Sequence, residues 1–113
     1  MTSHARYERL LAKAIAAPDP VAALRAAARA RSTPPSLRKA LARADPDGIR
    51  IAALLVARLR FERVLRGSAE ASDWFARDPA AFTESFRRYH HEVPLQDFFP
   101  AAEARRFSTW SRL

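Results

Sequence analysis

The side chains best suited to catalysis or metal binding form the run His90-His91-Glu92 near the end of the chain. Imidazole and carboxylate groups bind transition metals and can transfer protons. Consecutive residues of a helix point about 100° apart, so these three side chains do not converge on one point. Glu84 and His91 share a helix face, but they provide two ligands at most. We therefore expect no metal site in this chain and interpret the histidines as solvated or hydrogen-bonded.

Nucleophilic and nucleotide-dependent chemistry is disfavoured by the residues that are missing. The sequence contains no Gly-x-Ser-x-Gly turn and no cysteine, so it lacks the usual setting of a serine or thiolate nucleophile. The only glycines are Gly48 and Gly67, too few for a glycine-rich phosphate loop. Acidic residues such as Asp45, Asp73 and Asp78 are better explained as helix caps and turn residues than as acid–base pairs. We predict that the chain is not an enzyme by itself and needs no cofactor.

Positive charge is concentrated in the first third of the chain. Of the net charge of +8, residues 1–44 contribute +7, from nine Lys or Arg and two acidic residues. A GC-rich coding bias is one explanation of the preference for Arg over Lys, but it does not explain why acids are missing from one end only. Such a field favours an acidic partner: nucleic acid, an anionic membrane surface, or an acidic protein or peptide.

The helices that position the residues discussed above are predicted from dipeptides that end in proline. Proline is tolerated in the first helical turn, and a preceding aspartate caps the unpaired N–H groups. Asp19-Pro20, Asp45-Pro46, Asp78-Pro79 and Phe99-Pro100 each precede a helix-forming stretch. The expected helices cover about 3–17, 20–31, 35–44, 46–66, 69–77, 79–91 and 100–110, with an irregular segment over 92–99.

The expected helix over residues 46–66 is apolar on most sides, which is typical of a helix at the centre of a domain. On a helical wheel, a broad apolar arc that includes Leu54 and Leu55 lies opposite Ile49. Arg58 and Glu62 fall inside this arc, four residues apart. We interpret them either as a buried polar device that binds a partner or as a self-satisfied ion pair.

The fold class predicted is all-α, with a single domain over residues 1–113 built from six or seven short helices around the helix at 46–66. Its basic helices lie in residues 1–44, and the core-forming, aromatic-rich part lies in 45–113. Phe82, Phe86 and Tyr89 share one helix face and should pack on the central helix. No secretory signal is recognisable, and the longest apolar run is far short of the ~20 residues that span a bilayer. We therefore expect a cytoplasmic protein that does not bind membranes.

The C-terminal two thirds resembles the small accessory proteins of multinuclear non-haem iron-dependent oxidative enzymes in ribosomal-peptide biosynthesis. The resemblance is carried by the Arg-studded segment Ala53–Leu65, by Trp74-Phe75, and by the aromatic run Phe82–Pro94. It implies that a partner enzyme holds the iron and performs the oxidation. This chain would be a non-catalytic subunit that recruits an acidic precursor peptide, docks on the enzyme, or does both.

On this interpretation, four arginines attract the peptide and four aromatic residues anchor a partner. These are Arg25, Arg29, Arg38 and Arg43, and Phe98, Phe99, Phe107 and Trp110. Because adjacent residues cannot share a helix face, one of Phe98 and Phe99 is a candidate for exposure; core and interface positions both stay open.

The alternative interpretation is a nucleic-acid-binding regulator. The helices expected at 20–31 and 35–44 could imitate a helix-turn-helix, with Arg38, Lys39 and Arg43 on the second helix for phosphate contacts. Against it, only Ser36 on that helix is suited to contact base edges.

Overall fold

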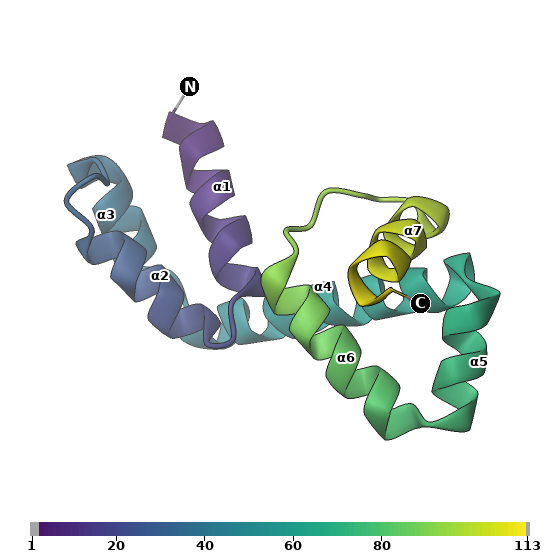
Figure 1. Ribbon diagram of the computed structural model, residues 1–113. Coiled ribbons are helices and arrows are strands. Elements are labelled where there is room, and N and C mark those ends of the chain that lie inside the picture. Colours follow the sequence, from purple (N-terminus) through teal and green to yellow (C-terminus); the bar gives the residue numbers. More distant parts are fainter. Residues whose placement is uncertain (1–2, 113) are drawn as a thin grey trace. The chain divides into compact units, whose positions relative to one another are not determined.

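The computed structural model describes residues 3–112, which form seven α-helices and no strand (Figure 1). The all-α prediction is confirmed, and each expected helix is present. The helices are α1 (Ser3–Ala16), α2 (Pro20–Arg29), α3 (Pro35–Ala42), α4 (Pro46–Gly67), α5 (Ala69–Arg77), α6 (Pro79–Glu92) and α7 (Pro100–Ser111).

The chain divides within α4 into two compact units, Met1–Val56 and Ala57–Leu113, each with its own hydrophobic core. From the sequence, we placed the change from the basic to the aromatic-rich part after residue 44. The structural division comes later, because the first turn of α4 still contributes Ile49 to the core of the first unit.

The three Asp-Pro caps are confirmed, whereas Asp73 lies inside α5 and caps no helix. Asp19 accepts a hydrogen bond from the backbone N–H of Ala22 at 3.0 Å, and Asp78 accepts one from Ala81 at 3.2 Å. Asp45 does the same for Gly48 at 3.1 Å. These bonds satisfy N–H groups that the first turn of a helix leaves unpaired.

The core of the first unit is thin. Its buried members are Ala14 of α1, Leu24 of α2, Leu41 of α3 and Ile49 of α4. Helix α2 packs against both α1 and α3. Because α2 is rich in alanine, it allows close helix approach but buries little apolar area.

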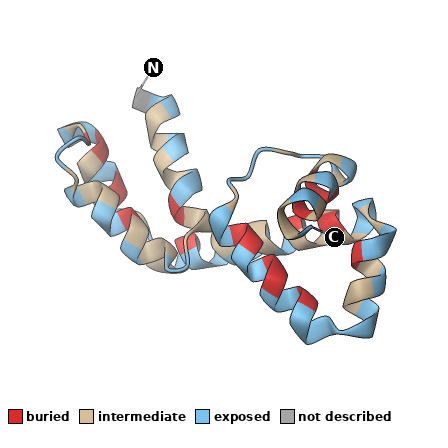
Figure 2. Ribbon diagram, in the orientation of Figure 1, coloured by how far each residue is buried: buried red, intermediate tan, exposed pale blue. Residues whose placement is uncertain are grey.

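The core of the second unit is aromatic. Buried residues follow one side of α6 (Figure 2), and they include Phe82, Phe86 and Tyr89. Phe61 of α4 packs against this stripe, with its ring centroid 5.1 Å from that of Phe86. The prediction that the stripe packs on the helix at 46–66 is confirmed. Both tryptophans, Trp74 and Trp110, pack against this same core.

Only part of the apolar arc that we predicted to be buried on α4 is buried: Phe61 and Leu65 pack against the core of the second unit, but the rest of the arc is exposed. The buried side chains are Ile49, Arg60 and Val64, whereas four large aliphatic side chains of the helix are more than half exposed. These exposed residues are Ile51, Leu54, Leu55 and Leu59. The wheel was misleading because the buried side carries an arginine, so a count of apolar residues favoured the other side.

Gly67, at the end of α4, is required by a close approach within the second unit. A Cβ atom at this position would lie 2.1 Å from the carbonyl oxygen of Pro100 and 2.7 Å from the Cβ of Ala104. The helix ends here, as predicted, but Gly67 has no positive φ. Its role is to let α4 and the start of α7 pack closely.

Candidate functional site

Arg60 is the largest side chain that is fully buried among the described residues, and it organises the second unit. Its Nε donates to Oε1 of Glu103 at 2.7 Å, and Glu103, on α7, is also completely buried. A buried guanidinium requires a counter-charge, because moving an isolated ion out of water is very costly. Glu103 supplies that charge.

The second oxygen of Glu103 is used by Tyr89. The Tyr89 hydroxyl donates to Oε2 at 2.5 Å, and the guanidinium of Arg60 lies 4.5 Å from the centroid of the Tyr89 ring. Burial, followed by the hydrogen bond to the Glu103 carboxylate, raises the pKa of Tyr89 far above its usual range. The phenol therefore stays protonated and serves as a donor to Glu103.

The remaining N–H groups of Arg60 point at the backbone that follows α6. Nη1 donates to the carbonyl of Val93 at 2.7 Å, and Nη2 donates to that of Pro94 at 3.2 Å. Nη1 also lies 3.4 Å from both the carbonyl oxygen and Nδ1 of His90. Within residues 3–112, no buried side-chain polar atom is left without a partner. The polar groups around Arg60 therefore all have hydrogen-bond partners, and the hydrogen bonds of Arg60 hold the backbone that follows α6.

His90 is buried beside Arg60 and stacks on the ring of Phe86, with 6.0 Å between ring centroids. Burial, followed by repulsion from Arg60 and His91, lowers the pKa of His90 to about 4. His90 is therefore neutral near pH 7. Of the two states predicted for the histidines, solvated or hydrogen-bonded, His90 has the second.

A second set of contacts holds the far part of the segment 93–99, hereafter the 93–99 loop. Oδ2 of Asp97 accepts from Nε of Arg106 at 2.7 Å, and the carbonyl of Asp97 accepts from Nη1 of Arg63 at 3.4 Å. The hydrogen bond from Arg106 lowers the pKa of Asp97. Residues of α4 and α7 thus hold the loop near both of its ends.

The 93–99 loop presents apolar side chains to solvent. Phe98 is 72% exposed and Phe99 is 74% exposed, while Leu95 is 37% exposed. Core and interface positions were both open for one of the two phenylalanines, and both side chains lie at the surface. Two adjacent exposed phenyl rings on a loop held by a buried ion pair form the candidate site.

The other two aromatic residues predicted as anchors differ from these. Phe107 is fully buried and packs edge-on against Tyr89, so the prediction that it anchors a partner is wrong. It lies on the face of α7 that faces the core. Trp110 is partly buried, and its indole N–H donates to Oε2 of Glu92 at 2.9 Å. Trp110 is therefore only partly accessible to a partner.

Of the four predicted arginines, Arg25, Arg29 and Arg43 are exposed. Arg38 is half-buried and donates to the carbonyls of Thr33 at 2.8 Å and Arg31 at 3.1 Å. Its guanidinium closes the turn between α2 and α3. Its charge is not paired with a carboxylate among the described residues, so its role in attracting an acidic partner stays a prediction.

The predicted pair of Arg58 and Glu62 forms, at 3.3 Å, but not inside the protein. The Arg58 side chain is 77% exposed. The interpretation as a self-satisfied ion pair agrees with this geometry, whereas the buried location was wrong. The buried ion pair of this unit, Arg60 with Glu103, was not predicted.

The described part of the chain contains no group of three or more His, Cys, Asp or Glu side chains placed to hold a metal ion. None of the seven helices is both long and apolar enough to span a membrane. No family model, no curated protein and no solved structure matches this chain.

Proposed function

We propose that this protein is a non-catalytic binding subunit that docks on a partner protein through the 93–99 loop. The observation that carries the proposal is the exposure of the adjacent rings of Phe98 and Phe99, at 72% and 74%. Single exposed apolar residues are common on protein surfaces, but a contiguous apolar group is typical of an interaction site.

The hydrogen bonds that hold the 93–99 loop support a role of the exposed phenylalanines in docking. Arg60 fixes the carbonyls of Val93 and Pro94, and Arg106 fixes the Asp97 carboxylate. A pre-organised loop loses less conformational entropy on binding than a mobile one, so more of the contact energy appears as affinity. Aromatic anchors of this kind commonly dominate binding at protein interfaces.

The partner we propose is an oxidative metalloenzyme of peptide natural-product biosynthesis, in keeping with the resemblance noted for the C-terminal two thirds of the chain. The iron and the oxidation would belong to that enzyme. The first unit would recruit an acidic precursor peptide, a task suited to the exposed Arg25, Arg29 and Arg43. A cytoplasmic location stays a prediction.

The test is co-purification of the tagged protein with a co-expressed multinuclear non-haem iron-dependent oxidative enzyme. Replacing Phe98 and Phe99 together by Ser should abolish the complex without unfolding the protein, because neither ring is buried. Leu54→Ser is the matched control, since Leu54 is also 72% exposed but lies on α4. A complex that survives the double substitution, or that Leu54→Ser weakens equally, contradicts docking through the loop.

Nucleic-acid binding is the second candidate, supported by the exposed basic residues Arg29, Lys39 and Arg43 on the α2–α3 hairpin. The engagement of Arg38 in the turn removes one basic residue from the helix that would enter a groove. This alternative predicts a shift of duplex DNA whose affinity falls steeply with salt.

A further inference from the structure

Helix α4 carries four large aliphatic side chains that belong to neither hydrophobic core. Their spacing, i, i+3, i+4 and i+8, places them on one side of the helix, and each is between 51% and 72% exposed. Within residues 3–112, neither core includes any of them. Single exposed apolar residues are ordinary, but a contiguous group is typical of an interaction site. We call this group the aliphatic face of α4; its members are Ile51, Leu54, Leu55 and Leu59.

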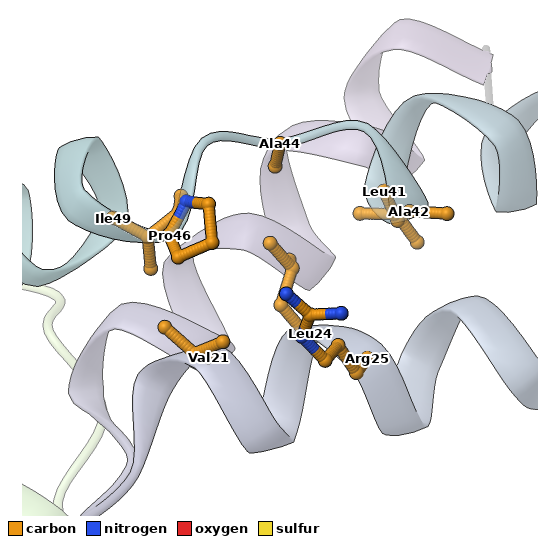
Figure 3. A pocket seen from close by; sticks show the side chains of 8 residues that line it. All are labelled: Val21, Leu24, Arg25, Leu41, Ala42, Ala44, Pro46 and Ile49. Carbon is orange, nitrogen blue, oxygen red and sulfur yellow. The ribbon is translucent and has the colours of Figure 1, made fainter.

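The other side of α4 is already covered in the first unit. Ile49 is buried there with Leu24 of α2 and Leu41 of α3. Figure 3 shows Ile49 and Pro46 near Val21 and Leu24, around a hollow that has room for about one water molecule. Because that side is filled, the aliphatic face is the part of this helix that is left for a partner.

Two exposed residues of opposite charge lie on the same side of the helix as Ile51. Asp47 is four residues before Ile51 and Arg58 is seven residues after it, and both intervals return to one side of an α-helix. The point halfway between Asp47 and Arg58 falls between Ile51 and Leu54. An acid and a base therefore lie at equal distances on either side of this part of the aliphatic face.

We propose that the aliphatic face of α4 binds the same face of a second copy of this chain, with the two helices antiparallel. In a two-fold interface each contact occurs twice. Antiparallel pairing about the halfway point brings Ile51 of one copy beside Leu54 of the second, and it places Asp47 of each copy opposite Arg58 of the other. Parallel pairing would bring like charges together instead, so the charges select the antiparallel arrangement. This inference goes beyond the proposed function and does not depend on it.

The ion pairs that Asp47 and Arg58 form within one chain do not oppose this arrangement. Asp47 pairs with Arg50 at 3.2 Å, and Arg58 pairs with Glu62 at 3.3 Å. Exposed pairs of this kind contribute little to stability, so their exchange for contacts between two copies costs little. Burial of the aliphatic side chains supplies most of the affinity, while the charges fix the direction of pairing.

A second copy fits the aliphatic face better than an anionic membrane does. Membrane-bound helices carry basic residues along the polar side and the flanks of their apolar face, whereas Asp47 lies on the same side as Ile51. A helix from another protein would need an acid and a base at matching positions. This chain supplies both itself.

The experiment measures the dimer Kd of the full chain by sedimentation equilibrium over a range of protein concentrations. We expect a Kd on the order of 10 µM, because a contact limited to one helix per copy falls at the low end of interface sizes. Leu54→Ser should raise the Kd by about tenfold. Asp47→Arg and Arg58→Asp should each raise it by about tenfold, because each places like charges together at two related positions. The double variant restores opposite charges and should return the Kd to within about threefold of the wild-type value.

Two comparisons separate these contacts from the effect of net charge. Glu84→Arg makes the same change of charge as Asp47→Arg, but on the exposed surface of α6, and it should leave the Kd nearly unchanged. Arg58→Asp lowers the net charge of +8, which by itself would favour association. A weaker dimer in Arg58→Asp therefore identifies a specific contact.

A protein that stays monomeric at all concentrations would overturn the inference, and so would single charge reversals that leave the Kd unchanged or a double variant that does not restore it. A monomer whose co-purification with the enzyme is lost in Leu54→Ser would assign the aliphatic face to another protein and would also overturn it. Substitution of Phe98 and Phe99 should leave the Kd unchanged. A dimer that this substitution abolishes would place the contact on the 93–99 loop and reject the aliphatic face.

Discussion

Arg60 and Glu103 are far apart in the sequence, yet both side chains are fully buried, and Nε of the first lies 2.7 Å from Oε1 of the second. This ion pair joins α4 to α7 and, through the other N–H groups of Arg60, holds the start of the 93–99 loop. The surface that we propose for docking therefore depends on a buried electrostatic contact.

Removing one partner of the buried pair should be strongly destabilising. Glu103→Ala leaves the Arg60 charge in the core without compensation, which costs roughly 3–5 kcal/mol in the free energy of unfolding. Arg58→Ala, which breaks an exposed pair on the same helix, should cost about 0.5 kcal/mol or less. Urea denaturation of the two variants checks the contrast, and equal costs would disprove the role of the buried pair.

Releasing the far end of the 93–99 loop should affect its order more than global stability. Asp97→Asn removes the charge that pairs with Arg106 at 2.7 Å. We expect faster hydrogen exchange at the backbone amides of residues 95–99 and faster dissociation from the partner, with the urea midpoint nearly unchanged. Glu84→Gln, which removes the carboxylate of the exposed pair with Arg87, serves as the control. Unchanged exchange in Asp97→Asn would show that this contact does not order the loop.

Acid should destabilise the protein through His90. Its pKa is lowered to about 4 in the folded state, from an unperturbed value of 6.5, so the unfolded state gains a proton first as the pH falls. The stability contributed by neutral His90 is complete above pH 6.5 and is lost between 6.5 and 4. The loss amounts to at most about 1.4 kcal/mol per pH unit, and on the order of 2–3 kcal/mol in all.

Urea denaturation between pH 7 and pH 4 measures this dependence. His90→Gln should flatten the decline relative to the wild-type protein, whereas substitution of the exposed neighbour, His91→Gln, should leave it largely intact. Carboxylates that titrate in the same range are common to all three proteins, so the difference isolates His90. Parallel pH profiles for the wild-type and His90→Gln proteins would refute the prediction.

Gly67→Ala should be the more harmful of two glycine substitutions on α4. Its Cβ would overlap the Pro100 carbonyl, a backbone group that cannot move without displacing α7, and we expect a loss of about 1–3 kcal/mol. At Gly48 the added Cβ meets only the side chain of Asp45, at 3.2 Å, and alanine favours the helix by about 1 kcal/mol. Gly48→Ala should therefore be close to neutral. Thermal unfolding of both variants tests the order.

Local signals in the sequence predicted the helices well. The Asp-Pro pairs predicted helix starts because a cap depends only on a side chain and the backbone N–H groups of the next turn, as Asp19 and Asp78 show. The adjacent phenylalanines of the 93–99 loop were candidates for exposure on equally local grounds. These features require no knowledge of how distant segments meet.

Long-range electrostatic contacts could not be predicted in this way. On the helical wheel, Arg60 lies about 20° from Ile49, on the side of α4 that is buried. An arginine at such a position is normally taken as a sign that this side of the helix faces solvent. Glu103, in the first turn of α7, has the usual place of an acid that complements the helix dipole at the surface. The packing of α4, α6 and α7 brings the two side chains together, and each can be buried because the opposite charge of the other compensates it.

The placement of Trp74 and Trp110, both against the core of the second unit, has a consequence for spectroscopy. Intrinsic tryptophan emission reports on that unit alone, whereas far-ultraviolet circular dichroism reports on all seven helices. Two optical signals recorded on one heated sample thus distinguish a concerted melting of the two cores from a stepwise one, without any label.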